Sequence, residues 1–317
     1  MIDKKIHRIA IIGAGGMARN HIKAFQDIDG VEVVGIFSRT QEKTKILASD
    51  YSIEIVANSI EELYTLTLAD LVVVAVPVLE TAGVVRRVFE FPWVSLIEKP
   101  VGYNYQEATD LVSLASKLKA RSYVALNRRH LSSTNAVINE LAESKSQRIV
   151  HVYDQETPEI EVEEGAAALL VENWMFGNSI HVLDYFYLFA RGELVSIDHI
   201  APWGSDSKNL CMAKLTFSSG DIGIYEAIWD APGPWAVTVT TKEKRWEMRP
   251  LEKAYVQNYR SRVLEALPVS DWDSEFKPGL RVQAQEAVNL LDKLPSKLPS
   301  LGDALRTMGL VKAIYEI

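Results

Sequence analysis

The sequence of 317 residues predicts an α/β fold: an N-terminal doubly wound parallel sheet, then an α+β domain with a large, mainly antiparallel sheet. Two observations predict the first part. A glycine-rich turn follows an apolar segment near the N-terminus, and strand-like and helix-like segments alternate up to about residue 126. The third observation is a change after Asn127, where strand-like segments cluster together. We therefore expect one domain over residues 1–126 and a second over residues 127–317.

The N-terminal segment combines a strand, a turn and a helix. Ile9–Ile12 is a short apolar run suited to a buried strand, and a helix-capable segment extends from Ala18 to about Ile28. The turn between them reads Gly13-Ala14-Gly15-Gly16-Met17-Ala18, the G-x-G-x-x-A pattern of a dinucleotide-binding Rossmann domain. Gly13 permits backbone angles that a side chain would forbid, and Gly15 leaves no Cβ between the chain and a pyrophosphate. The helix start offers unpaired N–H groups to an anion, so we expect the pyrophosphate here.

The rest of the first domain continues the alternation. Leu71–Val76 is apolar on both faces, as expected of a central parallel strand covered by helices. Ser59 and Glu62 form a capping box that predicts a helix start. Strands are expected at Val31–Phe37, Ile53–Ala57, Leu71–Val76, Val94–Ile97 and Tyr123–Leu126, and helices at Glu42–Ser49, from Ser59 to about Leu66, at Glu80–Phe89 and at Gln106–Leu118.

The second domain is predicted from clustered strands. Ser218-Ser219-Gly220-Asp221 lies between two strand-like runs and indicates a hairpin. Strands are expected at Arg148–Glu156, Leu194–His199, Cys211–Phe217, Ile222–Trp229 and Val237–Thr241, and helices at Thr134–Glu143, Asn178–Phe189, Arg281–Leu291 and Asp303–Tyr315.

Composition limits the class of protein. The formal net charge of −8 argues against a nucleic-acid-binding protein, which would carry a basic patch. The single cysteine, Cys211, excludes an intramolecular disulfide framework and a multi-cysteine metal site. No secretory leader pattern is present, and no apolar run approaches the ~20 residues of a membrane span. We expect a cytoplasmic protein that binds no nucleic acid, membrane or metal.

A candidate for the chemistry lies at the carboxyl end of the strand Val94–Ile97, where open α/β sheets bind ligands. Glu98-Lys99-Pro100 follows this strand directly. Lys99 is held between a strand and a proline, and burial and a positive nicotinamide would both disfavour its charged form. Such a lysine can exchange protons near neutral pH. The alternative is an ordinary surface lysine in a loop.

The chain resembles the Gfo/Idh/MocA oxidoreductases, the relatives of glucose-fructose oxidoreductase and inositol dehydrogenase. The resemblance rests on Gly13–Ala18, on Glu98-Lys99-Pro100 and on Asn127-Arg128-Arg129. It extends to Asn178–Asp184, where the family has its catalytic histidine on a helix, and to Lys277-Pro278-Gly279 and the closing Leu301–Ile314 segment.

The resemblance implies roles for the matching residues. Lys99 and His181 would be the catalytic pair: one takes the hydroxyl proton as hydride leaves the carbinol carbon, and the other orients the oxygen. An unperturbed imidazole already titrates near working pH. The Lys99–Pro100 bond is often cis in the family, which would aim the amine. Substrate contacts are expected from Lys99, Asn127, Arg128, Asn178, His181 and Asp184, and cofactor contacts from Gly13, Ala14, Gly15, Gly16, Met17, Ser38, Arg39, Thr40, Lys43, Pro77, Glu98 and Lys99.

One position departs from the family pattern. Family members usually carry an aspartate four residues before the histidine, and this chain has Gly177 there, followed by Asn178. An amide cannot stabilise an imidazolium by charge, so His181 could be less basic than in relatives. Asp184, three residues after His181, could substitute. Alternatively, Asn178 caps the helix and Asp184 points to solvent.

The end of the second strand predicts cofactor choice. An acid there would accept hydrogen bonds from the ribose 2′-OH of NAD, whereas an arginine accommodates the 2′-phosphate of NADP. The chain has Ser38-Arg39-Thr40, with no acid before Glu42 and with Lys43 close by. This favours NADP(H), although NAD(H) stays possible because Arg39 could stack on adenine with either cofactor.

The predicted function is an NAD(P)-dependent oxidoreductase acting on a secondary alcohol or ketone of a sugar, cyclitol or nucleotide sugar. The missing aspartate motivates an alternative, a non-catalytic cofactor-binding sensor of the same fold. A third possibility is a reductase of a non-sugar ketone, imine or tetrapyrrole. A homodimer or homotetramer through residues of about 194–250 is expected, because an open sheet with one apolar face must be covered.

Other histidines and the tryptophans carry less information. We expect the remaining histidines, which have no metal-ligand spacing, to be structural or exposed: His7, His21, His130, His151 and His199. The tryptophans are expected mainly in a core or an interface, with some able to stack on a sugar: Trp174, Trp203, Trp229 and Trp235.

Overall fold

The computed structural model describes residues 6–163, 165–204 and 209–317, and these form two compact units. Unit 1 comprises the chain up to Asn127 together with Ser274–Leu305, and unit 2 comprises Arg128–Asp273 and Arg306–Ile317. The two domains expected from the sequence, 1–126 and 127–317, differ from these units near the C-terminus. Ser274–Leu305 lies with unit 1 because its helix packs on the first helix of the chain.

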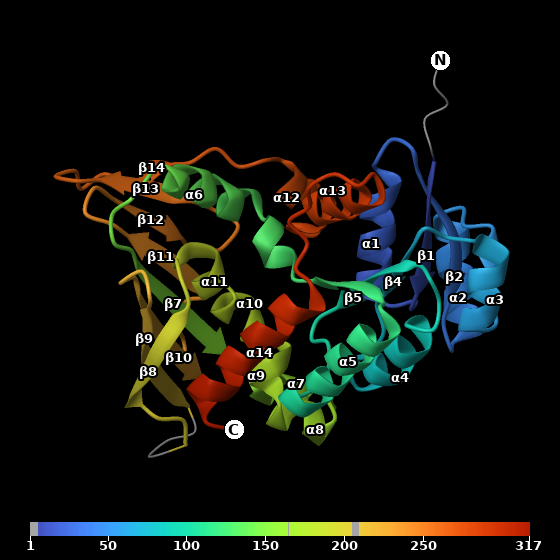
Figure 1. The fold of residues 1–317 in the computed structure, drawn as a ribbon, viewed down its shortest axis with the longest axis horizontal. Coiled ribbons are helices and arrows are strands. Elements are labelled where there is room, and N and C mark those ends of the chain that lie inside the picture. Colours follow the sequence, from blue (N-terminus) through green and yellow to red (C-terminus); the bar gives the residue numbers. More distant parts are fainter. Residues whose placement is uncertain (1–5, 164, 205–208) are drawn as a thin grey trace. The chain divides into compact units, whose positions relative to one another are not determined.

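Unit 1 is built on a parallel sheet, which confirms the predicted fold class of the N-terminal half. Its strand order among the described residues is β3-β2-β1-β4-β5-β6 (Figure 1). The direction of strand addition reverses between β1 and β4, which creates the crevice where such sheets bind ligands. The strands are β1 (His7–Ile12), β2 (Val31–Phe37), β3 (Ile55–Val56), β4 (Leu71–Val74), β5 (Val94–Glu98) and β6 (Arg121–Ala125).

Helices cover this sheet, and β4 is buried along its whole length as its apolar sequence predicts. Ser59 Oγ accepts the backbone N–H of Glu62 at 3.1 Å, so the predicted cap opens α3. The helices of unit 1 are α1 (Gly16–Gln26), α2 (Gln41–Asp50), α3 (Ile60–Thr67), α4 (Val78–Val88), α5 (Tyr105–Leu118), α12 (Trp272–Glu275, shared at its first residues with unit 2) and α13 (Leu280–Leu291).

Helix α13 completes the core of unit 1. Its buried residues Leu280 and Ala284 belong to the same hydrophobic cluster as Ile22 and Phe25 of α1. Arg281 Nε, also on α13, lies 2.6 Å from Asp27 Oδ2, just after α1. The predicted helix over 281–291 is therefore present, but it packs on the N-terminal sheet unit.

Unit 2 is built on a mainly antiparallel sheet, which confirms the second half of the predicted fold class. Its strand order among the described residues is β14-β13-β12-β11-β7-β10-β9-β8, and β7 and β10 form a parallel pair in its middle. The predicted hairpin joins β9 to β10. The strands are β7 (Ile149–Glu156), β8 (Leu194–Ala201), β9 (Leu210–Phe217), β10 (Ile222–Trp229), β11 (Ala236–Thr240), β12 (Lys244–Met248), β13 (Tyr255–Asn258) and β14 (Glu265–Ala266).

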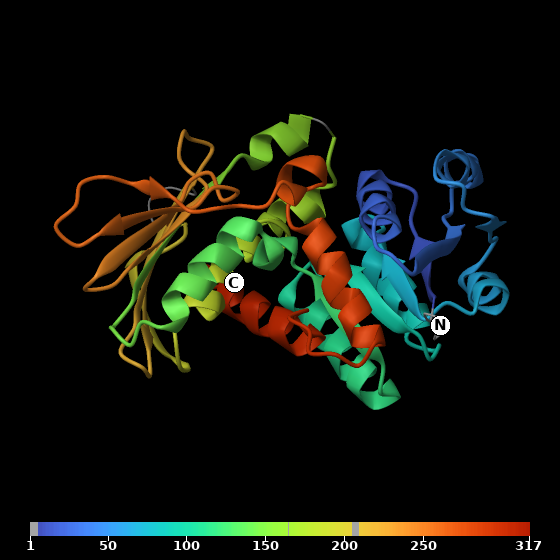
Figure 2. The same ribbon diagram turned by 90° about the horizontal axis from the view of Figure 1, so that it is seen from above.

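One face of this sheet is covered by helices (Figure 2). On β7, Val150 and Val152 are fully buried, whereas Ile149 on the alternate face is 44% exposed. This alternation is the expected pattern of a sheet with one covered face. The helices of unit 2 are η1 (Asn127–His130, from its second residue), α6 (Ser132–Ala142), α7 (Pro158–Glu163), α8 (Ala168–Glu172), α9 (Trp174–Gly177), α10 (Ile180–Leu183), α11 (Tyr185–Phe189) and the end of α14 (Leu301–Tyr315).

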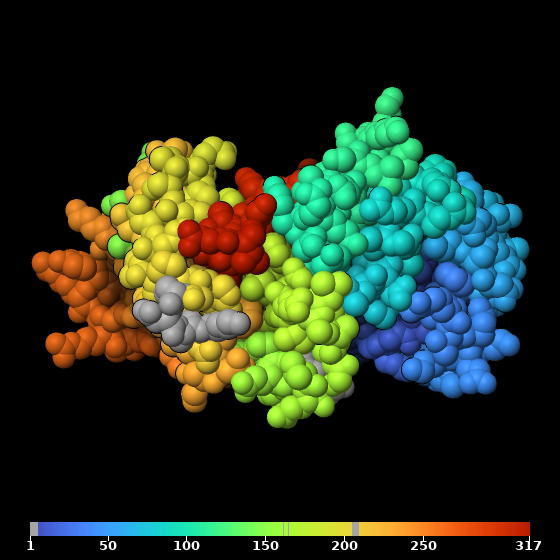
Figure 3. Space-filling model, turned by 90° about the horizontal axis from the view of Figure 1, so that it is seen from below, coloured from blue at the N-terminus to red at the C-terminus, as the bar shows by residue number. Residues whose placement is uncertain are grey.

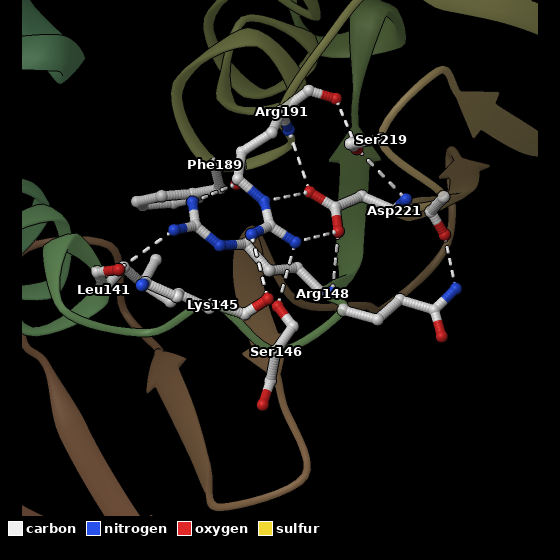
Figure 4. A network of polar contacts seen from close by, with 10 residues as sticks. Leu141, Lys145, Ser146, Arg148, Phe189, Arg191, Ser219 and Asp221 are labelled. Atoms are coloured by element: carbon white, nitrogen blue, oxygen red, sulfur yellow. Dashed lines mark hydrogen bonds and ion pairs between the residues drawn. The ribbon is translucent and has the colours of Figure 1, made fainter.

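A buried ion network fixes the beginning of β7 (Figure 4). Asp221, at the β9–β10 hairpin, is fully buried and accepts hydrogen bonds from Arg191 Nε and Nη2 at 2.9 and 2.7 Å. Arg148 donates to the carbonyl oxygens of Leu141 and Phe189. Burial alone would raise the pKa of Asp221, but the hydrogen bonds from Arg191 and from backbone N–H groups lower it to about 2.

Two segments differ from the sequence prediction. The single helix expected over Asn178–Phe189 is divided into α10 and α11, because several backbone bonds tighten to i−3, as from Tyr187 N to the carbonyl of Asp184. Helices α7 and α8, which the sequence did not predict, lie at the surface, in lime green in Figure 3. Among the described residues, no helix combines the length and apolar character needed to cross a bilayer.

Candidate active site

The glycine-rich turn of unit 1 connects β1 to α1. Gly13 has a φ of +123°, and a Cβ at this position would lie 2.0 Å from the carbonyl oxygen of Ala75, after β4. Its N–H donates to the carbonyl of Phe37, at the end of β2, at 2.8 Å. A side chain would not fit at position 13. Glycine is needed here so that the ends of β1 and β2 and the residue after β4 can approach one another.

The next glycines face open space. A Cβ added at Gly15 or Gly16 would meet no atom within 4 Å, so no protein contact demands a glycine at these two positions. Gly15 is the N-cap of α1, and no side chain caps this helix start. Ala18 is fully buried beneath the turn, and Ala14 and Met17 are half-buried beside it. The turn thus presents free helix N–H groups beside open space, which fits a pyrophosphate.

The carboxyl end of β2 carries the residues expected to select the cofactor. Arg39 is 68% exposed at its side chain, and its Nη1 lies 2.9 Å from Glu80 Oε1 in the first turn of α4. Ser38 Oγ accepts the N–H of Thr40 at 3.4 Å, and both Thr40 and Lys43 are exposed. These groups lie at the same sheet edge as the glycine turn, because β1 and β2 are parallel neighbours.

Two further predicted residues lie at this edge. Pro77 is exposed and is the N-cap of α4. Lys99 follows β5 directly, is half-buried, and forms a cis peptide bond with Pro100. Since β4 and β5 are parallel neighbours, Lys99 belongs to the same ligand-binding edge.

Glu98 and Asn127 are engaged within unit 1. Glu98 is 8% exposed, and its Oε1 lies 2.7 Å from Nε2 of His21, a residue of α1 that is 1% exposed. Asn127 Nδ2 donates to the carbonyl of Pro278 at 2.8 Å. Glu98 therefore fixes the end of β5 to α1, and Asn127 fixes the end of β6 to the segment before α13.

In unit 2 the predicted residues His181 and Arg128 meet at one tryptophan. His181, on α10, is 6% exposed, and its ring meets the ring of Trp235 edge-on at 6.2 Å between centroids. The Arg128 guanidinium lies over the ring of Trp235 at 5.1 Å. Arg128 Nη1 also lies 2.5 Å from Glu252 Oε1. The ring of Trp235 therefore contacts both the Arg128 guanidinium and the His181 imidazole.

Asp184 has a different environment from either of the two expected. It is 2% exposed, so it does not point to solvent. Its oxygens accept hydrogen bonds from Arg129 Nε and Nη2 at 2.5 and 2.7 Å, and from Thr307 Oγ1 at 2.8 Å. The charge of Asp184 is therefore neutralised by Arg129.

Asn178 is held by an acid from the sheet. Its Nδ2 donates to Glu156 Oε2 at 2.7 Å, and Trp174 Nε1 donates to the same oxygen at 2.7 Å. Asn178 therefore does not cap its helix through its side chain, and Ser179 is the N-cap of α10. The segment from 174 to 178 is tied to the end of β7 by one carboxyl group.

Several residues of this site were missed in the sequence. Asp154 and Glu156 alternate in phase with the buried Val150 and Val152, and this pattern could have placed both acids on the covered face of β7. His21 lies on the helix that follows the glycine turn, but its partner is 77 residues away. Among the described residues, no group of three His, Cys, Asp or Glu side chains could hold a metal ion.

The comparisons with known proteins agree with this geometry. Residues 7–126 match the sequence model of the oxidoreductase family with an NAD-binding Rossmann fold, Gfo/Idh/MocA. A curated relative, glucose-6-phosphate 3-dehydrogenase of Bacillus subtilis (strain 168), is 29% identical over 135 residues. That match covers 40% of this chain and 36% of the relative's length.

Solved structures resemble the whole chain. UDP-N-acetylglucosamine 3-dehydrogenase from Acidithiobacillus ferrooxidans has a TM-score of 0.77 at 15% identity, covering 98% of this chain and 97% of that one. A 3-ketoreductase from Actinomadura kijaniata, in complex with TDP-benzene and NADP, has a TM-score of 0.71 at 18% identity, covering 98% of both chains. These likenesses establish the fold of both halves. At the level of sequence, the similarity to the Gfo/Idh/MocA oxidoreductase family covers residues 7–126, the N-terminal Rossmann part of the chain.

Proposed function

We propose that this protein is an NADP(H)-preferring oxidoreductase that transfers hydride between the nicotinamide and a secondary alcohol or ketone of a carbohydrate-type substrate. One observation carries the proposal: Lys99 lies at the ligand-binding edge of the parallel sheet that also holds the glycine turn. A bound nicotinamide supplies the hydride acceptor or donor. The chain must then supply a proton-transfer group and hold the reacting oxygen.

Lys99 and His181 are the proposed catalytic residues. In oxidation, one takes the hydroxyl proton while hydride leaves the carbinol carbon, and the other donates a hydrogen bond to the same oxygen. In reduction, the proton returns to the oxygen from the same group. Arg128, Asn127 and Asn178 are proposed to line the substrate. Asp184 is the least suited of the predicted substrate contacts, because Arg129 already neutralises it.

The substrate class is proposed from the family and its relatives. The curated relative is named a 3-dehydrogenase of glucose-6-phosphate and one solved neighbour a 3-dehydrogenase of UDP-N-acetylglucosamine. Another neighbour is named a 3-ketoreductase in complex with TDP-benzene and NADP. A sugar, cyclitol or nucleotide sugar is therefore the first class to test. Nothing in the comparisons supports the alternative of a non-catalytic sensor.

The experiment that tests this function replaces Lys99 by methionine, which keeps the side-chain length and removes the amine. Stopped-flow absorbance of the reduced nicotinamide over a panel of sugars and nucleotide sugars identifies a substrate for the native protein. Lys99→Met is expected to slow hydride transfer at least ~10²-fold while cofactor affinity is retained. Lys117→Met, at an exposed position of α5, is the matched control. Turnover by Lys99→Met at the native rate would refute the mechanism, and tight cofactor binding without turnover of any panel member would favour the sensor.

Cofactor preference is proposed from the end of β2. Arg39 offers a planar, permanently charged fork, and Ser38 and Thr40 offer hydroxyl groups. The exposed pair of Arg39 with Glu80 leaves the guanidinium at the surface, where a 2′-phosphate can compete for it. We therefore propose NADP(H) as the preferred cofactor, with NAD(H) accepted more weakly.

A homodimer or homotetramer is proposed through the uncovered face of the sheet in unit 2. The side chains that face outward from β10 include Ile222, Ile224 and Ile228, each half-exposed, and Ile149 of β7 lies opposite Ile222. Exposed aliphatic side chains grouped on several adjacent strands are typical of an interface. A second copy of the chain is the proposed occupant.

A further inference from the structure

Two acidic side chains lie side by side inside unit 2. Asp154 and Glu156 are two residues apart on β7, so they point to the same, covered face of the sheet. Each is only 2% exposed. Burying an acid costs free energy unless hydrogen bonds or a charged partner compensate it. The groups that contact Asp154 and Glu156 therefore indicate the role of the two acids.

Glu156 holds the segment that leads into the histidine helix. Its Oε2 accepts hydrogen bonds from Trp174 Nε1 and Asn178 Nδ2, both at 2.7 Å. These two donors lie on either side of Gly177. The N–H of His181 in turn donates to the carbonyl of Asn178 at 3.1 Å. One carboxyl oxygen therefore fixes the backbone from which α10 starts.

Asp154 holds the other neighbour of the histidine. Its Oδ1 accepts from Trp235 Nε1 at 2.7 Å, and its Oδ2 accepts from the Tyr225 hydroxyl at 2.6 Å. Trp235 is the side chain that the ring of His181 meets edge-on, with an interplanar angle of 88°. The two acids thus fix both the start of the histidine helix and the aromatic wall beside the imidazole.

We propose that Asp154 and Glu156 act together as positioning residues for His181 and take the place of the carboxylate that Gly177 cannot supply. The proposal rests on the proposed function of His181 as a proton-transfer group. In the family pattern the acid lies four residues before the histidine, whereas here both acids come from strand β7.

The charge of the pair supports this assignment. Burial, and then the neighbouring Asp154 carboxyl, raise the pKa of Glu156 to about 9. Glu156 Oε1 is buried and no N–H or O–H group of the described residues donates to it, so no hydrogen bond would stabilise a negative charge on this oxygen. Both oxygens of Asp154 accept hydrogen bonds, which suits the ionised form. The geometry therefore assigns the negative charge of the pair to Asp154 and the proton to Glu156.

The other titratable groups around the pair leave that charge in place. Tyr225 donates to Asp154, and its hydroxyl also lies 2.7 Å from that of Tyr315 on α14. Burial raises the pKa of both tyrosines well above the usual range and raises that of Cys211, on β9, to about 12, so all three stay neutral. A cation, Arg128, contacts this group of side chains across the Trp235 ring. A single negative charge behind Trp235 favours the imidazolium form of His181.

The test distinguishes the negative charge of Asp154 from the tether, by which we mean the two hydrogen bonds that Glu156 accepts from Trp174 and Asn178. Glu156→Gln keeps an acceptor for Trp174 and Asn178 and leaves Asp154 as the single charge, whereas Glu156→Ala removes the tether. Asp154→Asn removes the charge. Glu226→Gln is the matched control, because this glutamate of β10 lies on the outward face, half-exposed and close to His151.

The first readout is an NMR titration of His181 in the protein without cofactor, which does not depend on activity. Asp154→Asn is expected to lower the pKa of His181 by about one unit, while Glu156→Gln and Glu226→Gln leave it within a few tenths of the native value. An unchanged His181 pKa in Asp154→Asn would overturn the proposed role of the charge.

The second readout is steady-state kinetics with a substrate found for the native enzyme. Glu156→Ala is expected to lower kcat at least ~10-fold with little change in KM and none in cofactor affinity. Glu156→Gln is expected to keep the native kcat at pH 7 and to lose less activity than the native enzyme above pH 9, where Glu156 ionises. A native kcat and native pH profile in Glu156→Ala would overturn the tether. Failure of the proposed function itself is recognised separately, because the native protein would then bind the cofactor without turning over any member of the substrate panel, whereas the His181 titration needs no activity.

Discussion

The Lys99 amine and the His181 imidazole are held in place by different means. Lys99 follows a strand whose last residue, Glu98, is fixed by a buried histidine of α1. His181 lies in a short helix that is fixed from the sheet through Asn178 and flanked by Trp235. In both cases the proposed proton-transfer group is supported by a buried acid, so the supporting residues can be tested independently of the chemistry.

The His21–Glu98 pair gives a prediction on stability. His21→Leu removes the partner of a carboxyl group that is 8% exposed, and we expect the free energy of unfolding to fall by about 3 kcal/mol. The double variant His21→Leu/Glu98→Leu is expected to recover much of the loss, because no buried polar group is left without a partner. Urea unfolding followed by circular dichroism measures both. Equal stability of the single and double variants would contradict the expected cost of leaving the Glu98 carboxyl without its partner.

Arg39 gives a prediction on cofactor selection. Arg39→Ala is expected to weaken NADPH binding by about 10-fold or more, since charge-assisted hydrogen bonds to a phosphate are lost, with little effect on NADH. Glu80→Gln releases Arg39 from its ion pair and is expected to bind NADPH as tightly as the native protein or more so. Quenching of tryptophan fluorescence gives the dissociation constants. Equal losses for both cofactors in Arg39→Ala would mean that Arg39 contacts the part they share.

Single residues differed in how far the sequence could predict them. The glycine turn and Lys99 were predictable because their signals are local: a strand, a turn and a proline within a few positions. The surroundings of Asp184 were not, because its partners Arg129 and Thr307 lie 55 and 123 residues away. A replacement for the missing aspartate is expected from the sequence within one helical turn, at Asp184, whereas the acid that contacts this segment, Glu156, comes from a strand.

At the scale of elements, strands were easier to predict than the short helices of unit 2. β9 and β10 are mainly apolar runs joined by a clear turn, and their predicted pairing is confirmed. The segment Asn178–Phe189 is mostly apolar and aromatic, which predicts one continuous helix. The structure divides it because Asn178 and Asp184 are anchored outside the helix, by Glu156 and Arg129. Strand β12 was missed because charged residues interrupt its pattern, and β13 and β14 were missed because they are only 4 and 2 residues long.

The ion network at the β9–β10 hairpin gives a prediction on stability and pH. Since the pKa of Asp221 is lowered to about 2 in the folded protein, its contribution is present above about pH 4 and is lost as the pH falls towards 2. Asp221→Asn also leaves Arg148 and Arg191 without their acid, so we expect a loss of about 3 kcal/mol at pH 7. The difference from the native protein should shrink below pH 4.

Thermal unfolding between pH 2.5 and pH 7 measures this difference. Asp198→Asn is the matched control, because Asp198 of β8 is 61% exposed and lies 3.6 Å from Lys214 in an ion pair open to solvent. We expect this control to change stability by less than ~0.5 kcal/mol. A pH-independent loss in Asp221→Asn would indicate that packing rather than charge fixes the hairpin.

At the scale of the whole molecule, the uncovered sheet face predicts self-association. Ile224→Lys places a charge in the middle of this face and is expected to weaken the homodimer or homotetramer at least ~100-fold, because burying an unpaired charge is costly. Leu66→Lys, at a leucine of α3 that is 51% exposed, is the control. Light scattering at micromolar concentration compares the two. A monomeric native protein would contradict the proposal.

The path of the chain through the two units sets the order in which they can form during synthesis. Unit 1 needs α13, whose apolar residues complete the core around α1, yet α13 is made only after residues 128–273 of unit 2. On the ribosome, the first 127 residues therefore emerge with part of the surface of α1 uncovered and must wait for a segment about 150 residues later. A fragment that stops at residue 127 is expected to aggregate for the same reason. The unit that binds the cofactor is the first to begin folding and cannot be the first to finish.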